Sequence, residues 1–188
     1  SSQVTALACA SVPSDGGAKP QSVVIVGMER GVAAVFADGD GKLVQVPLAP
    51  FASRSDAKVE SPTATAQELA LQTTVCAQDD LLVVGSALGC LAFARLTLST
   101  AATTGDARKA PSLRAEWSTH SLPASGLLSC SIVALAGSPW IAVAAEDGST
   151  FLLPVVKQTA ASSSSLVVAE NKGDCSQFCA DTLHWLSA

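Results

Sequence analysis

Charged and large aromatic side chains are scarce in this sequence. Of its 188 residues, 14% are charged, and there are only 5 Phe, 3 Trp and no Tyr. The net charge is −5 and the isoelectric point is about 4.8, so the chain lacks the positive field that attracts nucleic acid. Aromatic platforms on which single-stranded bases stack are equally scarce. We therefore expect no nucleic-acid partner.

Long uninterrupted hydrophobic segments are absent as well. The nearest candidate, from Leu81 to Leu96, is broken by Gly85, Gly89 and Arg95. A membrane-spanning helix needs about 18 or more apolar residues in a row. The sequence, which starts at Ser1, shows no secretory signal. These absences predict a soluble intracellular protein that does not insert into a membrane.

The six cysteines show no spacing that is typical of a metal site or of a disulfide framework. Cys175 and Cys179 are separated by three residues, but no second pair of ligands follows them. We predict no bound metal and no cofactor. Four others lie in apolar segments and are expected to be buried like small hydrophobic residues, namely Cys9, Cys76, Cys90 and Cys130.

Motifs of the common enzyme classes are missing. The pair Gly85–Ser86 has the wrong spacing for the G-x-S-x-G turn of a serine hydrolase. Gly41–Lys42 is followed by Leu43, where a phosphate-binding loop requires Ser or Thr. We therefore predict a protein that is not an enzyme, with no catalytic residues and no small-molecule substrate.

Groups that could bind calcium or transfer protons have simpler structural interpretations. The sequence DGDG at 38–41 lacks the third acidic ligand and the distant Glu of a calcium loop, so it predicts a hairpin turn. Glu146 and Asp147 adjoin a turn glycine and predict a solvated turn in preference to an acid–base pair. His120 and His184, the two histidines, are interpreted as structural residues.

Repeated apolar hairpins dominate the rest of the sequence. Hydrophobic residues make up 48% of the chain and 33 of them are alanines, so we expect a core of Val, Leu and Ala. Three segments share a pattern of apolar run, short turn, glycine and second apolar run: 22–36, 80–94 and 139–153. Their turn glycines, Gly31, Gly89 and Gly148, lie 58 and 59 residues apart. This nearly constant spacing predicts a repeat architecture.

Each repeat holds four predicted strands. The two hairpin strands are nearly continuous in Val, Leu and Ile, which predicts burial on both faces. One further strand precedes the hairpin, and another follows it with the polar–apolar alternation that suits an exposed edge. Four strands per unit is the composition of a propeller blade. The sequence thus predicts an all-β fold, a WD40-like β-propeller, with blades at 4–48, 73–122 and 131–171 and the first strand of a fourth at 178–188.

The segments between the repeats are rich in Ser, Thr, Ala and Pro and have no hydrophobic period. They cover residues 49–67, 99–111 and 158–164, where we predict mobile surface loops. We interpret the whole chain, 1–188, as a single incomplete propeller domain. Such a partial propeller would expose two blade faces and an open edge. We therefore expect the ring to be completed, by sequence beyond Ala188 in preference to a partner chain.

Five short sequence stretches resemble one WD40 family, although the Trp-Asp and Gly-His signatures of standard WD40 repeats are absent. The stretches occur in the order and at the spacing of the nucleoporin forty-three family, the small WD40 subunits of the Y-shaped outer-ring complex of the nuclear pore. The likeness covers a little over half of the chain, from about Ala70 onward, and the first repeat matches weakly. The matching stretches are VVGSALGC (Val83–Cys90), EWSTH (Glu116–His120), SCSIVAL (Ser129–Leu135), IAVAAEDGSTFLL (Ile141–Leu153) and ADTLHWL (Ala180–Leu186).

This resemblance implies a seven-bladed propeller, of which the chain carries about three blades. It also implies a non-enzymatic scaffold at the nuclear envelope, in the nuclear pore complex. Such a scaffold would bind other outer-ring nucleoporins and contribute to pore assembly and to the transport of mRNA and protein. The alternative is another WD40 interaction module, such as a substrate adaptor of a ubiquitin ligase or a vesicle-coat subunit.

The three tryptophans are the first candidates for partner contact, because protein interfaces are enriched in Trp. Trp117 lies in a polar outer strand and is the predicted contact residue. Trp140 and Trp185 adjoin apolar runs, so we expect both of them in the core.

Overall fold

Twelve β-strands make up the regular structure that the computed structural model describes. The described residues are 3–14, 19–29, 31–38, 40–51, 72–99, 112–124, 126–135, 137–160 and 163–168. Within them the strands form three antiparallel sheets of four, and there is no helix. In each sheet, strands that follow one another in the sequence are neighbours. The prediction of an all-β fold is confirmed.

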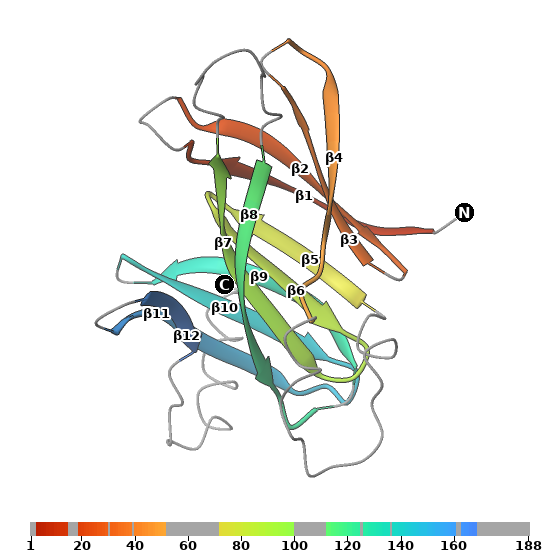
Figure 1. Cartoon of the computed structure of the whole chain (residues 1–188). Coiled ribbons are helices and arrows are strands. Elements are labelled where there is room, and N and C mark those ends of the chain that lie inside the picture. The colour runs from red at the N-terminus through yellow and green to blue at the C-terminus, as the bar shows by residue number, and fades with distance from the viewer. Residues whose placement is uncertain are drawn as a thin grey trace.

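The three sheets follow one another along the chain, and Figure 1 shows them in red to orange, yellow to green, and cyan to blue. The first sheet contains β1 (Val4–Val12), β2 (Gln21–Met28), β3 (Gly31–Ala37) and β4 (Leu43–Leu48). The second contains β5 (Gln72–Gln78), β6 (Leu81–Ser86), β7 (Cys90–Ser99) and β8 (Ser112–Ser121). The third contains β9 (Leu127–Leu135), β10 (Ser138–Ala145), β11 (Thr150–Ala160) and β12 (Ser163–Val168).

Two segments differ from the sequence prediction. β9 begins at Leu127, earlier than the predicted start at Ser131. Residues 158–160 and 163–164, predicted as loop, lie in β11 and β12, where Ala160 pairs with Ser163. Backbone N–H and C=O groups form this ladder whatever the side chains are, so a Ser-rich segment can still be a strand.

Other predicted segments lie largely outside the described residues. Only residues 49–51 and 99 of the predicted loops at 49–67 and 99–111 are described. Phe51 is buried in the core, and Ser99 is the last residue of β7, so the loop prediction is wrong for both residues. The predicted opening strand at 178–188 is not described at all. The structure therefore gives no bounds for these segments.

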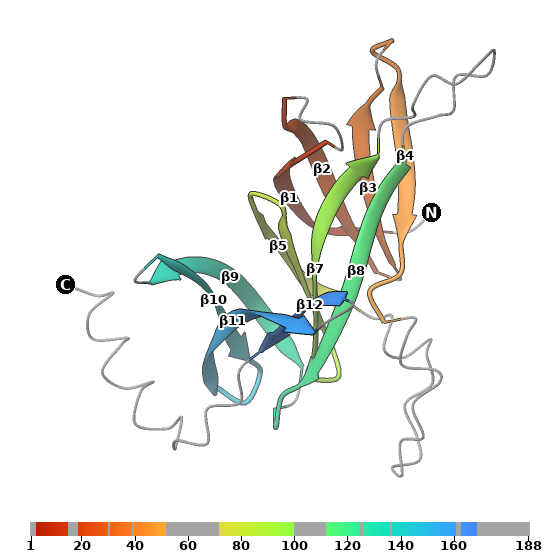
Figure 2. The same cartoon turned by 60° about the vertical axis from the view of Figure 1, so that its left-hand side comes forward.

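The first strand of each sheet lies at the centre of the arrangement. β5 lies beside β1 on one side and beside β9 on the other. The last strands, β4, β8 and β12, lie farther out, and the sheets fan apart from their first strands, as Figure 2 shows. This arrangement is compatible with a β-propeller-like fold. Over the described residues the sheets do not close into a ring.

The three sheets repeat one another down to single residues. In each sheet, the pairing of the first strand with the second shifts at one irregularity, and this irregularity has the same position in all three. The residues of the second strand next to it are therefore equivalent, namely Gly27, Gly85 and Ala144. The repeat predicted from the turn glycines is confirmed at the level of strand register.

Glycine at this repeat position lets neighbouring sheets approach each other. A Cβ atom added at Gly27 would lie 2.9 Å from Cγ2 of Val75 in the second sheet. A Cβ atom added at Gly85 would lie 3.2 Å from Cβ of Leu127 in the third sheet. In the third sheet the equivalent residue is Ala144, against which no described sheet packs. The glycines thus mark the two places where one sheet meets the next.

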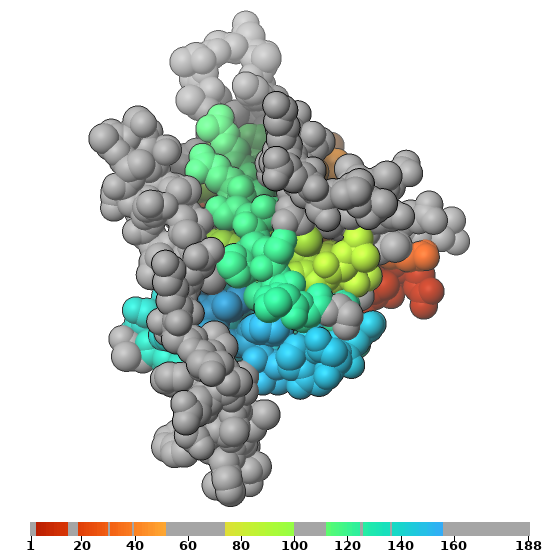
Figure 3. Space-filling model, turned by 90° about the horizontal axis from the view of Figure 1, so that it is seen from below, coloured from red at the N-terminus to blue at the C-terminus, as the bar shows by residue number. Residues whose placement is uncertain are grey.

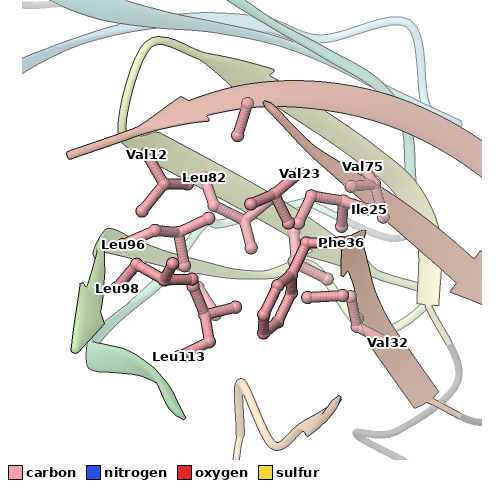
Figure 4. Close-up of a cluster of buried hydrophobic side chains, with 14 of the residues drawn as sticks. Val12, Val23, Ile25, Val32, Phe36, Val75, Leu82, Leu96, Leu98 and Leu113 are labelled. Atoms are coloured by element: carbon pink, nitrogen blue, oxygen red, sulfur yellow. The ribbon is translucent and has the colours of Figure 1, made fainter. Parts of the chain in front are cut away.

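Two hydrophobic cores fill the spaces between the three sheets. Leu82 and Val84 of β6 belong to the core between the first and second sheets, which also holds the side chains in Figure 4. Leu81 and Val83 of the same strand belong to the core between the second and third sheets. The prediction of burial on both faces is confirmed for β6. β2 and β10 are covered on one face, because each belongs to an outer sheet.

Candidate functional site

Each outer sheet has one face on which no described strand packs. The first open face belongs to the first sheet and is defined here by Leu7, Cys9, Val24 and Val26, which point away from the core. The second open face belongs to the third sheet and is defined by Trp140, Ala142, Ala144 and Leu152. The alternation of side chains along a strand places these residues opposite the buried ones. Figure 3 shows part of the third sheet, in blue, at the surface beside the green residues of β8.

The first open face is apolar and exposed. Leu7 is 67% exposed and Val24 is 40% exposed. Leu7 pairs with Val26, and Cys9 pairs with Val24, so the four side chains form two neighbouring rows without a charge. Contiguous exposed apolar surface of this kind is typical of interaction sites.

The equivalent positions of the second sheet show what this face can bind. By strand register, Val24 is equivalent to Leu82 and Val26 to Val84. Leu82 and Val84 have no exposed surface, because they pack against the first sheet. The first open face therefore carries the residues that, one sheet further on, are covered by a preceding sheet.

The second open face has the complementary character. By register, Trp140 is equivalent to Leu81, and Ala142 is equivalent to Val83. Leu81 is 3% exposed and Val83 is fully buried, because both pack against the third sheet. The half-buried Trp140 thus occupies a position that a following sheet covers elsewhere in the molecule. The two open faces together offer packing surfaces for β-sheets at both ends of the array.

The tryptophans lie differently from the sequence prediction. Trp140 was predicted in the core, and this is wrong: it is half-buried and lies on the second open face, opposite the buried Ile141. Trp117 lies in β8 across from Ala94, and its half-buried side chain packs against the core between the first and second sheets. Its role as a partner contact stays a prediction. Trp185 lies outside the described residues.

The cysteine and histidine predictions hold in part. Cys90 and Cys130 are buried and Cys76 is half-buried, whereas Cys9 is exposed on the first open face. The prediction for Cys9 is wrong because its apolar segment has one uncovered face. His120 is half-buried in β8. His184, Cys175 and Cys179 lie outside the described residues.

The two acidic segments are turns, as predicted. Asp38 accepts hydrogen bonds from the backbone N–H groups of Asp40 and Lys42, at 2.9 and 2.8 Å. Asp147 accepts hydrogen bonds from the hydroxyl and the backbone N–H of Ser149, which hold the pKa of this exposed carboxyl below its ordinary value. These carboxylates stabilise local backbone turns.

The described residues include neither a candidate metal-binding cluster nor a candidate membrane-spanning helix. Within them, no group of three or more His, Cys, Asp and Glu side chains is placed to hold a metal ion. The same ranges contain no helix with the length and apolar character needed to cross a membrane.

No protein-family model matches the chain, and no curated protein matches it either. The family resemblance therefore rests on the five matching sequence stretches.

Proposed function

We propose that this protein is a non-enzymatic scaffold of the WD40 β-propeller type, a structural nucleoporin of the outer-ring, Y-shaped complex of the nuclear pore. Its three sheets are three blades of a larger ring, which the family resemblance makes seven-bladed. Its task is to bind other outer-ring nucleoporins at the nuclear envelope. Through this binding it contributes to pore assembly and to the transport of mRNA and protein.

The observation that carries the propeller part of this proposal is the pair of open apolar faces, which neighbouring blades of the larger ring would cover. They repeat residue positions that are buried between sheets inside the same molecule, so sheet-on-sheet packing is the interaction that they fit. Burial of apolar surface contributes roughly 25 cal/mol per Å². This interaction needs no cofactor and no turnover. The choice of partner class rests on the five sequence stretches that resemble the nucleoporin forty-three family.

Aromatic anchors commonly dominate the binding energy of such surfaces. Trp140 on the second open face is the aromatic residue that we propose as the anchor for the neighbouring blade of the ring. Trp117 is the proposed contact with a partner protein, because its side chain is only half-buried at the outer strand of the second sheet. Neither role involves nucleic acid, membrane insertion or a small-molecule substrate.

The partner class is tested by tagging the full-length protein at its native locus, purifying it under mild conditions and identifying the co-purified proteins by mass spectrometry. We expect the other outer-ring nucleoporins in stoichiometric amounts. A tagged, unrelated WD40 protein from the same cells serves as the control and is expected to recover none of them.

Recovery of ubiquitin-ligase subunits or vesicle-coat subunits without nucleoporins would contradict the proposal. It would assign the protein to another class of WD40 interaction module.

A further inference from the structure

Two cysteine side chains meet between the second and third sheets. Cys76 of β5 and Cys130 of β9 have their sulfur atoms 3.3 Å apart, and the Cys130 thiol donates a hydrogen bond to Cys76. Both are free thiols in the structure. A disulfide has a sulfur–sulfur distance of about 2.05 Å, so bond formation requires the two atoms to approach by about 1.3 Å.

Thr74 holds the two strands together at this point. Its hydroxyl oxygen accepts a hydrogen bond from the backbone N–H of Cys130 at 3.2 Å. The same hydroxyl lies 3.5 Å from the Cys130 sulfur. Thr74 is buried and precedes Cys76 in β5, so it fixes β9 beside β5 at the level of the two sulfur atoms. The proximity of the cysteines is thus set by the packing of two central strands.

The hydrogen bond between the two sulfur atoms couples their protonation. This hydrogen bond lowers the pKa of Cys130, burial opposes the effect, and the hydrogen bond with the Thr74 hydroxyl lowers the pKa further. The hydrogen bond to Cys130 and burial raise the pKa of Cys76. Thiolates are the nucleophiles of thiol–disulfide exchange. Once the pair has lost one proton, the two sulfur atoms share the remaining proton.

Access to the pair is from the side of Cys76. This side chain is half-buried, whereas Cys130 is 8% exposed. A small disulfide can therefore reach the Cys76 sulfur first, and the buried Cys130 is placed to resolve the mixed disulfide.

We propose that Cys76 and Cys130 form a reversible disulfide that fastens the second sheet to the third, by exchange with a low-molecular-weight disulfide such as glutathione disulfide. The pair loses one proton to solvent, and the Cys76 sulfur attacks glutathione disulfide in the state in which Cys130 holds the remaining proton. A mixed disulfide forms and one glutathione thiolate leaves. This thiolate takes the proton of Cys130, whose sulfur then attacks the Cys76 sulfur.

The second attack releases another glutathione thiolate, which takes a proton from solvent. Overall, two protein thiols lose two electrons and two protons and become a disulfide, and glutathione disulfide is reduced to two glutathione molecules. The bond closes a loop between residues that are 54 positions apart. Disulfides in reducing compartments are usually transient, so we expect this bond to form only under oxidising conditions.

The test uses the whole chain, incubated either with glutathione disulfide or with dithiothreitol. Non-reducing tryptic mapping is expected to join the peptide 59–95 to the peptide 115–157, with fragment ions that assign the bond to Cys76 in preference to Cys90. A cross-link of this loop length is expected to raise the Tm by on the order of 10 °C. Dithiothreitol is expected to reverse both changes.

Variants Cys76→Ala and Cys130→Ala are expected to lose the cross-link and the shift in Tm. Cys9→Ala, at the exposed cysteine of β1, is the matched control and is expected to keep both. Peptide maps of the oxidised wild-type chain that show only glutathione adducts, or a bond from Cys76 to Cys90, would overturn the proposal. Since these maps need no variant, the test stands even where a variant fails to fold.

Discussion

Replacement of Phe93 by alanine is expected to destabilise the fold by about 3–5 kcal/mol. Phe93 of β7 is 1% exposed and lies in the core between the second and third sheets. Removal of its ring leaves a cavity that the strands on both sides cannot fill, because each is held by its own hydrogen-bonded sheet. Urea denaturation followed by circular dichroism measures the change as a lower midpoint at an unchanged slope.

Leu43→Ala is the matched control for Phe93→Ala. Leu43 is a large hydrophobic residue of β4 that is 78% exposed, so its truncation is expected to change the free energy of unfolding by no more than about 0.5 kcal/mol. Equal effects of the two substitutions would contradict the described packing of the second sheet against the third.

The second large effect is expected from Gly85→Val, at about 1–3 kcal/mol of destabilisation. A Cβ atom at Gly85 would lie 2.7 Å from Cγ2 of Thr74 on the neighbouring strand of the same sheet and 3.2 Å from Cβ of Leu127 in the third sheet, so the Thr74 side chain has to shift and the third sheet has to move away from the second. Valine favours strands, so intrinsic strand preference does not cause this loss. Thermal and urea unfolding of the variant and the wild-type chain measure it.

Ala144→Val is the control for Gly85→Val, because Ala144 occupies the same repeat position in the third sheet. No described sheet packs on it, and we expect a change within about 0.5 kcal/mol. A loss at Ala144 as large as that at Gly85 would show that the register equivalence does not govern the contact between sheets.

Strand number and sheet order could be predicted from the sequence because both depend on local signals. Apolar runs of five to seven residues predict strands, and the turn glycines Gly89 and Gly148 adopt positive φ angles of 72° and 83° that other residues rarely adopt. The constant spacing of these hairpins then predicts that the sheets are copies of one unit. The structure agrees with this prediction at the level of single paired residues.

Which faces are covered could not be predicted, because coverage depends on the neighbours of a sheet. Trp140 follows the same apolar pattern as Leu81, yet Leu81 is buried by a following sheet and Trp140 is not. Cys9 is exposed for the corresponding reason at the other end of the array. The candidate site therefore became visible only when the order and packing of the sheets were known.

The contact between Cys76 and Cys130 could not be predicted from the sequence for a different reason. By register, Cys76 is equivalent to Ala8 and Cys130 is equivalent to Val75, so the two cysteines occupy different positions of the repeat. They meet because Cys130 of β9 packs against β5 between Thr74 and Cys76. A comparison of repeats aligns equivalent residues and cannot show a contact between different repeat positions.

The central claim is that the two open faces pack against neighbouring blades of a larger ring, and it is tested by urea unfolding of face variants of the full-length protein. Val24→Glu and Trp140→Glu place a charge on the first and second open faces, and Glu116→Lys, at an exposed position of β8, is the control. Circular dichroism follows the unfolding of the three variants and of the wild type. We predict that each face variant lowers the free energy of unfolding by at least about 2 kcal/mol, because its charge is buried without a partner, and that the control changes it by no more than about 0.5 kcal/mol. Unchanged stability of both face variants would contradict the account.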